Sequence, residues 1–405
     1  MVELQTDLPA TAGPPRRPHR VGLVCDFVEE NWPSMDLVAD MLLQHLHDSH
    51  SRDFPVSRLR PPMRRHLGRL PFRPRAAYNA DRLLNRFLDY PRWLRNQVPE
   101  FDLFHVIDHS YAQLVHDLPP GRTVVTCHDL DTFRCLLDPE SEPRPRWFRS
   151  MTARILGGFK KAAHVITVSA ATRDAIMRHR LLPSERVTVI PNGVHPSCST
   201  LPDVRADAEL ARLLPPDSSN ALWILNVGST LNRKRLDVLL QVFAEIRACL
   251  PQVRLLRVGG PLTPSQSQLA RDLEIQDALV QLPSLNRDVL AAAYRRAHVL
   301  LHTADAEGFG LPVIEAMACG CPVIASDIPV LREVGGTAAA YCPVGNIDAW
   351  RNAGLQLLRE LSDAPAACQA RRTSAIARAG HFSWSKNAQQ TAQIYQQVIS
   401  TFKVE

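Results

Sequence analysis

Two glutamates eight residues apart, Glu307 and Glu315, flank a glycine loop and carry the strongest chemical signal in the chain. Gly308 and Gly310 allow backbone angles that other residues avoid, and Pro312 is typical of a first helical turn. The start of a helix presents unpaired N–H groups and the positive end of its dipole, so it favours a phosphate. Carboxylates do not bind phosphate, but they accept hydrogen bonds from hydroxyls. Phosphate flanked by hydroxyls is the chemistry of a nucleotide sugar.

The segment 307–315 resembles the signature of retaining family 4 glycosyltransferases, which have the GT-B fold. The resemblance implies that Glu307 contacts the transferred sugar in catalysis and that Glu315 binds the ribose hydroxyls of the donor. Glutamates at this spacing also arise by chance, but here the surrounding glycine, proline and alanine pattern accompanies them. The loop between them is expected to bind the donor. Its residues are Gly308, Phe309, Gly310 and Leu311.

A second loop, 226–236, offers positive charge after another apolar strand. Its Gly228 is followed by Arg233 and Lys234 near a helix start. Such cations neutralise a diphosphate, and main-chain N–H groups orient it. The resemblance implies this catalytic role for both, and Lys234 matches the family lysine. Many relatives carry their arginine where this chain has Ser229, which we place in the donor site with Gly228. A solvated basic helix start is the alternative.

Polar residues also follow other predicted strands. His128 resembles the family histidine that reaches the donor sugar, and a hydrogen-bonded structural histidine is the alternative. Gly259 either approaches the nucleotide with its backbone or forms a tight turn. The loop after the first strand lacks the glycines of many relatives, although Ser34 there is placed to cap a helix. On weaker grounds, we expect four acceptor-side residues, namely Asn31, Ser34, Asp108 and His109.

Apolar runs alternate with helical patterns along the chain, which predicts parallel sheets covered on both faces. The alternation fills 20–196, is lost over 197–220 and restarts in 221–380. We therefore expect an α/β protein of the GT-B class, with two Rossmann-like domains facing each other across a cleft and 197–220 as the linker. Residues 1–19 are expected to be a disordered leader. By resemblance, 381–405 is a helix that crosses back to the first domain.

Composition narrows the class of protein. The length of 405 residues suits two domains, and 45% hydrophobic with 22% charged residues is typical of globular proteins. A net charge of +6 permits an acidic substrate without requiring nucleic acid, and we expect no nucleic-acid partner. The nine cysteines show neither a disulfide framework nor zinc spacing, which favours reduced thiols in the cytoplasm.

An arginine-rich run, 58–75, holds seven arginines and no acids, with Leu, Met and Phe between them. A basic stretch with apolar residues suits an anionic lipid surface, at about 1 kcal/mol per charge near the surface. Ordinary solvated surface is the alternative. Peripheral contact with the inner face of the plasma membrane is therefore an open expectation.

The resemblance and the residues together predict a retaining glycosyltransferase acting in glycan or glycolipid assembly. It would move a sugar from a nucleoside diphosphate sugar to a hydroxyl of a sugar or lipid-linked acceptor, by a front-face reaction in which the leaving diphosphate takes the proton. No cofactor and no metal are expected, because protein cations hold the diphosphate. Two alternatives are a sugar-nucleotide epimerase of the same fold and a catalytically silent sugar-nucleotide-binding protein.

Overall fold

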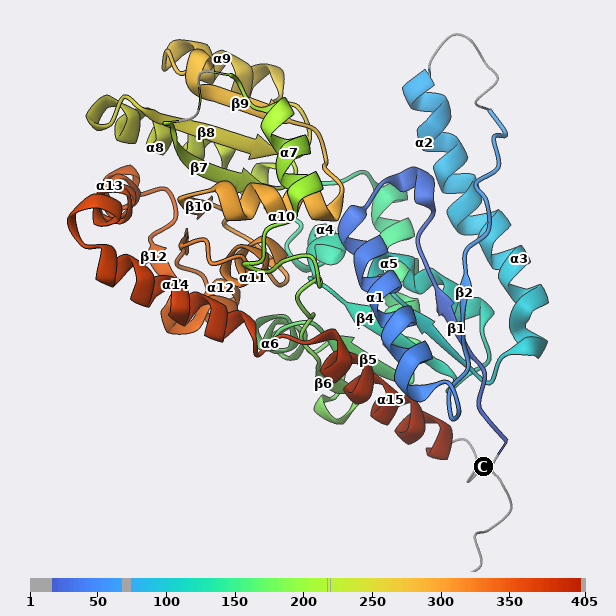
Figure 1. The fold of residues 1–405 in the computed structure, drawn as a ribbon. Helices are drawn as coiled ribbons and strands as arrows, with labels where there is room; N and C mark the ends of the chain where they lie inside the picture. The colour runs from blue at the N-terminus through green and yellow to red at the C-terminus, as the bar shows by residue number, and fades with distance from the viewer. Residues whose placement is uncertain (1–16, 68–73, 217, 219, 402–405) are drawn as a thin grey trace, which may run out of the picture.

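The structure, a computed structural model, describes residues 17–67, 74–216, 218 and 220–401. Over these residues the chain forms two separate β-sheets, and the strand pairings in both are parallel (Figure 1). Successive strand residues point to opposite faces of a sheet, and apolar cores cover both faces. The predicted α/β fold with two Rossmann-like halves is confirmed.

The first sheet has the strand order β2-β1-β3-β4-β5-β6. The order changes direction between β1 and β3, so loops that follow these strands flank a switch point, where such sheets bind ligands. The strands are β1 (Val21–Val24), β2 (Val56–Leu59), β3 (Leu103–Val106), β4 (Thr123–Cys127), β5 (His164–Thr167) and β6 (Val187–Val189).

Helices cover this sheet on both faces. α2 and α3 are joined by a π-helical turn, Asn85–Asp89, into one long helical segment. The helices are α1 (Pro33–His50), α2 (Pro74–Leu84), α3 (Tyr90–Gln97), α4 (Arg134–Leu137), α5 (Arg146–Lys161) and α6 (Ala170–Arg178).

The second sheet has the order β12-β11-β10-β7-β8-β9, with its switch point between β7 and β10. The loops after these two strands hold the two sequence motifs that predict donor binding. The strands are β7 (Leu222–Val227), β8 (Val253–Val258), β9 (Leu279–Leu282), β10 (Val299–His302), β11 (Val323–Ser326) and β12 (Ala340–Cys342).

The helices of the second half end with a long one that returns to the first half. α15 lies against α1, and Figure 1 shows it running beneath the first sheet. Among the described residues, none of the helices is both long and apolar enough to cross a membrane. The helices are α7 (Val204–Leu213), α8 (Leu236–Cys249), α9 (Pro264–Asp272), α10 (Arg287–Arg296), α11 (Leu311–Ala318), α12 (Pro329–Gly335), α13 (Ile347–Asp363), α14 (Pro365–Ala379) and α15 (Trp384–Thr401).

Within 197–220, which the sequence predicts as the linker, Asp203 caps α7 and this helix packs against α10. One local expectation is wrong. Ser34 does not cap α1, since the helix already begins at Pro33, whose missing N–H suits the first helical position. The domain boundaries themselves stay a prediction, and 1–16 of the expected leader lies outside the described residues.

Candidate active site

The loop that follows β10 lies against the loop that follows β4 in the other half. A Cβ atom on Gly308 would stand 2.0 Å from the carbonyl oxygen of His128, so only a glycine permits this approach. The hydroxyl of Ser169 also donates a hydrogen bond to the carbonyl oxygen of Gly308, at 2.9 Å. The fold therefore brings the predicted donor loop and the predicted cross-domain histidine together.

Glu307 is buried among cations. Its Oε1 accepts a hydrogen bond from Nζ of Lys234 and another from Nε2 of His302 at 2.8 Å. Nη1 of Arg233 lies 3.8 Å from Oε2. Burial acts to raise the pKa of Glu307, but the charge of Lys234 and the bond from His302 outweigh it and hold this pKa well below the usual value. Glu307 is therefore ionised at neutral pH.

Arg233 lies between carboxylates from both halves of the molecule. Its Nη2 is 3.8 Å from Oδ2 of Asp129, and its Nε is 3.8 Å from Oδ2 of Asp131. Nη1 donates a hydrogen bond to the carbonyl oxygen of Ala306 at 3.2 Å, but the buried Nε has no hydrogen-bond partner among the described residues. Because its ion pairs are longer than hydrogen bonds, the guanidinium keeps donors for an incoming anion.

Glu315 is buried on α11, and one of its two carboxylate oxygens has no hydrogen-bond partner among the described residues. Its Oε2 accepts a hydrogen bond from the hydroxyl of Tyr294 at 2.9 Å. Its Oε1 has no hydrogen-bond partner in the described structure and lies 3.5 Å from Nη1 of Arg287. Burial raises the pKa of Glu315, and the charge of Arg287 counteracts that only in part. A buried acceptor without a partner suits a ligand hydroxyl.

The predicted donor glycines are held close together. A Cβ atom on Gly259 would stand 1.9 Å from the carbonyl oxygen of Gly228, and Gly259 has a φ of +141°. Arg257 lies beneath them and donates to the carbonyl oxygens of Gly228 at 3.0 Å and of Gly260 at 2.5 Å. Burial lowers the pKa of Arg257 to about 10, so it remains charged. These bonds fix the backbone of both glycine loops beside Lys234.

Other predicted donor residues differ in what their side chains do. The ring of Phe309 is buried and packs edge-on against that of Phe382, at 5.6 Å between centroids. It therefore has a packing role, and only its backbone remains for the donor. Gly310 has a φ of +94° at the start of α11. Leu311 packs against apolar cores, whereas Ser229 is exposed.

On the first half, the predicted polar residues gather at the strand ends. His128 donates from Nε2 to the carbonyl oxygen of Ile107 at 2.9 Å, and burial lowers its pKa. Nδ1 of His109 lies 3.3 Å from Asp108, and its Nε2 lies 3.7 Å from Asp129. A histidine between two carboxylates thus connects the expected acceptor side to Arg233.

Asn31 and Ser34 lie apart from this group, at the start of α1. Asn31 ends a short 3-10 turn with a φ of +53°, and its side chain is exposed. Nearby, Nη2 of Arg287 from the second half donates to the carbonyl oxygen of Pro33 at 2.8 Å. The start of α1 therefore faces the donor half, and the acceptor roles of both residues stay predictions.

Several residues of this site escaped the sequence analysis. His302 is the last residue of β10, and Asp26 follows β1. Functional residues of parallel sheets tend to lie at the carboxyl ends of strands, and this rule could have found both. Both oxygens of Asp26 are buried without hydrogen-bond partners, and its pKa is raised well above normal by burial and by Asp108. Arg257 and Arg287 carry no motif, and only the fold shows what they contact.

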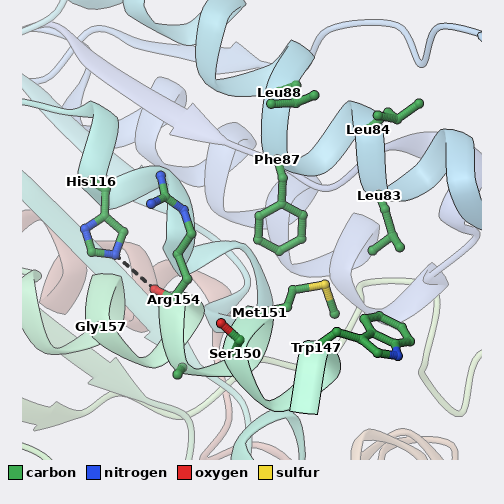
Figure 2. Close-up of a pocket in the computed structure, with 11 residues that line it drawn as sticks. Leu83, Leu84, Phe87, Leu88, His116, Trp147, Ser150, Met151, Arg154 and Gly157 are labelled. Carbon is green, nitrogen blue, oxygen red and sulfur yellow. Dashed lines mark hydrogen bonds between the residues drawn. The ribbon is translucent and has the colours of Figure 1, made fainter. Parts of the chain in front are cut away.

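A large apolar groove lies away from these residues. It has a volume of about 710 Å³ and lies between α2, the π-helical turn and α5 in the first half. Figure 2 shows Phe87 and Leu83 facing Met151 and Trp147 across it. As for metals, no cluster of three or more His, Cys, Asp or Glu in the described parts of the chain could hold an ion.

Solved structures match nearly the whole chain. Sucrose-phosphate synthase from Thermosynechococcus elongatus superposes with a TM-score of 0.73 at 22% identity, over 95% of this chain and 100% of that one. HepE from Anabaena, solved in complex with UDP and glucose, gives 0.70 at 18% identity, over 94% and 100%. The protein has the GT-B fold.

Each half of this GT-B protein also matches a family model. Residues 15–197 match Glycosyltransferase Family 4, and residues 216–371 match Glycosyl transferases group 1. Among curated proteins, the O-antigen chain mannosyltransferase RfbU of Salmonella typhimurium is 29% identical over 252 residues. That match spans 62% of this chain and 64% of RfbU.

Proposed function

We propose that the protein is a retaining glycosyltransferase that moves a sugar from a nucleoside diphosphate sugar to an acceptor hydroxyl. The observation that carries the proposal is the pair of glutamates at the start of α11. Glu307 is charged and surrounded by Lys234, His302 and Arg233, while Glu315 presents a buried, unpartnered oxygen. Cations for a diphosphate, from the loop after β7, and acceptors for hydroxyls thus lie together around the start of α11.

The diphosphate of the donor would bind between the cations and the N–H groups at the start of α11. Lys234 and Arg233 would neutralise the charge that develops as the sugar–oxygen bond breaks. In the front-face reaction, the acceptor oxygen bonds to the anomeric carbon on the side from which the diphosphate leaves. The acceptor proton passes to an oxygen of the departing diphosphate. No metal is required, because Lys234, Arg233 and the backbone supply the stabilisation.

For the donor we propose a uridine or guanosine diphosphate sugar, used in polysaccharide or glycolipid assembly. The bound UDP of the HepE complex supports uridine, and the name of RfbU supports a mannosyl transfer into a sugar chain. Both nucleotides share the ribose and diphosphate that the described residues suit.

A panel of nucleoside diphosphate sugars tests the proposal by thermal stabilisation. A ligand at 100 times its dissociation constant adds about 2.7 kcal/mol to the free energy of unfolding. The best donor is then incubated with sugar and lipid-linked acceptors, and NMR reports the anomeric configuration of the product. Retention in a transferred sugar supports the proposal. An epimerised donor, or binding without turnover over the full acceptor panel, would contradict it.

We further propose that the protein docks on an anionic membrane through the groove beside α5. Trp147 and Leu88 at the groove are 61% and 45% exposed. Over its whole length α5 carries five basic residues and no acidic one. Arg154 of α5 lies 4.0 Å from Asp117, and the other four basic residues leave α5 with a net positive charge. Apolar side chains beside net positive charge favour an anionic lipid surface over a neutral one. The enzyme would then work at the inner face of the plasma membrane on a lipid-linked acceptor.

The arginine run 58–75 is a weaker candidate for this contact. Arg58 is paired with Asp40, and Nη2 of Arg60 lies 2.5 Å from Asp36. These acids reduce the net charge that the run offers to lipid. Residues 68–73 lie outside the described structure, so a contribution of the run stays a prediction.

Sedimentation with vesicles tests the groove. Wild-type protein should bind phosphatidylglycerol-containing vesicles and not pure phosphatidylcholine, and Leu88→Ser with Trp147→Ser should release it. The matched control is Leu201→Ser with Val204→Ser, two residues that are 73% and 83% exposed beside and within α7. Docking at this face would be refuted if wild-type protein bound neither kind of vesicle. It would also be refuted if the groove variant bound phosphatidylglycerol-containing vesicles as well as the Leu201→Ser, Val204→Ser control does.

A further inference from the structure

Arg287 connects the donor carboxylate of one half to the start of α1 in the other. Its Nη1 lies 3.5 Å from Oε1 of Glu315, and its Nη2 donates to the carbonyl oxygen of Pro33 at 2.8 Å. Oε1 of Glu315 is the oxygen that has no hydrogen-bond partner among the described residues. A single planar guanidinium therefore contacts both the predicted ribose-binding group and the opposite half.

The position of Arg287 within its own helix gives no reason for a cation. It is the first residue of α10, and the positive end of a helix dipole disfavours positive charge there. Asn286 already caps the helix by accepting a hydrogen bond from the N–H of Val289. The two partners of Arg287 outside α10, Glu315 and the carbonyl oxygen of Pro33, therefore account for the placement of its side chain.

The surroundings of Glu315 give it no other charge. The titratable groups that face it are Arg287 and Tyr294 from α10 and Cys198 from the segment before α7, with Cys319 beside Cys198. Burial raises the pKa of Tyr294, so its hydroxyl is neutral. The hydrogen bond with Cys319, together with burial, raises the pKa of Cys198, so this thiol is neutral as well. A buried carboxylate without a cation gives up its charge by binding a proton.

We infer that Arg287 is a positioning residue for the donor, which holds Glu315 charged and oriented for the ribose hydroxyls and ties that arrangement to the start of α1. The inference rests on the proposed function of Glu315. The side chain of Arg287 would thereby complete the donor site through its contact with the acceptor half. Donor recognition and the approach of the two halves are thereby coupled.

Binding of UDP and its 2′-deoxy and 3′-deoxy analogues tests the role at the ribose. Arg287→Ala should weaken UDP binding by about 10-fold or more, the usual loss for a hydrogen bond to a charged group. The analogues should lose much less, because they already lack a hydroxyl. Arg287→Lys keeps a cation and should restore most of the preference for UDP. Equal losses for UDP and both analogues would overturn the inference.

The pH dependence of UDP binding gives a second readout. Protonation of Glu315 competes with the ribose, so affinity falls as pH is lowered through the pKa of the free site. Without Arg287 that pKa is higher, so the fall in affinity should begin at a higher pH in Arg287→Ala than in wild type or Arg287→Lys. The control is Arg295→Ala on the same helix, whose ion pair with Asp207, at 2.8 Å, lies apart from Glu315. Coincident profiles would contradict the role.

Hydrogen exchange tests the tie to α1 and needs no ligand. In Arg287→Ala, backbone amides of the peptide 31–40 should exchange faster than in wild type, and in Arg295→Ala they should not. Unchanged exchange would refute the contact between Arg287 and the start of α1, and the role of Arg287 at the ribose would then be decided by the UDP binding data. If wild-type protein binds neither UDP nor GDP, the proposed function of the site fails, whereas faster exchange in Arg287→Ala would still establish the contact between the halves.

Discussion

At the scale of single residues, the two glutamates of the motif show that surroundings decide what a carboxylate does. Both are buried, yet the pKa of Glu307 is lowered and that of Glu315 is raised. Lys234 and His302 both bond to Glu307, whereas the nearest cation to Glu315 stands 3.5 Å away. Glu307 is therefore held as a negative charge by its neighbours, whereas Glu315 keeps a buried acceptor oxygen that suits a hydroxyl.

Lys234→Ala should lower turnover by about 10² to 10³, the typical loss when one preorganised donor to a developing anion is removed. The free energy of unfolding should change much less. Steady-state kinetics with the identified donor measure the first, and chemical denaturation measures the second. Arg235→Gln is the matched control, because this neighbouring cation is paired with Asp237 at 2.8 Å. Equal activity of the two variants would remove Lys234 from the diphosphate site.

Glu307→Gln should lower kcat by about 10², since loss of orientation at the sugar has effects of that size. The bare nucleoside diphosphate should still bind, because Glu307 is assigned to the sugar. Glutamine keeps the size and one acceptor oxygen, so a defect reports the lost charge and not lost packing. Turnover and calorimetry on the same preparation separate the effects. Full activity would mean that this carboxylate is structural.

At the scale of elements, backbone contact between loops builds the site. The loop after β10 reaches the loop after β4 because Gly308 has no side chain. The glycine loops after β7 and β8 approach each other in the same way, and Arg257 bonds to both. The closeness of these loops therefore depends on missing Cβ atoms more than on any side-chain pair.

Gly308→Ala should destabilise the protein by about 1–3 kcal/mol, the usual cost of overpacking, and lower activity by separating the two loops. The new Cβ atom would stand 2.0 Å from a backbone oxygen, which cannot move aside as a flexible side chain can. Gly260→Ala is the control, because a Cβ atom there meets nothing within 4 Å. Chemical denaturation of both variants measures the difference, and equal stabilities would show that the loops separate without cost.

The sequence predicted the elements well where periodicity was strong, and the parallel halves and the two motif loops are as expected. It missed α7, because Ser, Pro and Asp around a short helix resemble a linker, while burial of Ala206 and Leu210 against α10 stabilises it. It could not find Arg287, since its partners lie far away in the sequence. Local pattern carries no information about contacts that only the assembled fold creates.

At the scale of the whole molecule, contacts between the halves occur in several places. Glu333 on α12 accepts hydrogen bonds from the N–H groups of Ala170 and Ala171 at the start of α6, at 2.7 and 3.1 Å. α15 adds a buried contact, in which the hydroxyl of Tyr395 lies 2.7 Å from Nδ1 of His105. The two halves are thus joined both near the donor loop and along the returning helix.

The burial of His105, which lies beside Tyr395 of α15, predicts acid sensitivity of the assembled molecule. Burial, with a smaller effect of His128, lowers the pKa of His105 to about 3 from the ordinary 6.5. Between these values the unfolded chain binds a proton that the folded protein does not, so stability is present above pH 6.5 and is lost as the pH falls. The free energy of unfolding should fall by about 1.4 kcal/mol per pH unit from this group.

Denaturation with urea at a series of pH values between 4 and 7 measures the slope. His105→Gln removes the titrating group and should show a shallower decline than wild type over this range, whatever its absolute stability. Tyr395→Phe is the companion variant, because it removes the hydroxyl partner and keeps the histidine. Its slope should stay close to that of wild type, since burial and not the tyrosine is the main cause of the lowered pKa. Parallel slopes for wild type and His105→Gln would show that His105 is not buried in its neutral form, and that α15 does not seal this part of the first half.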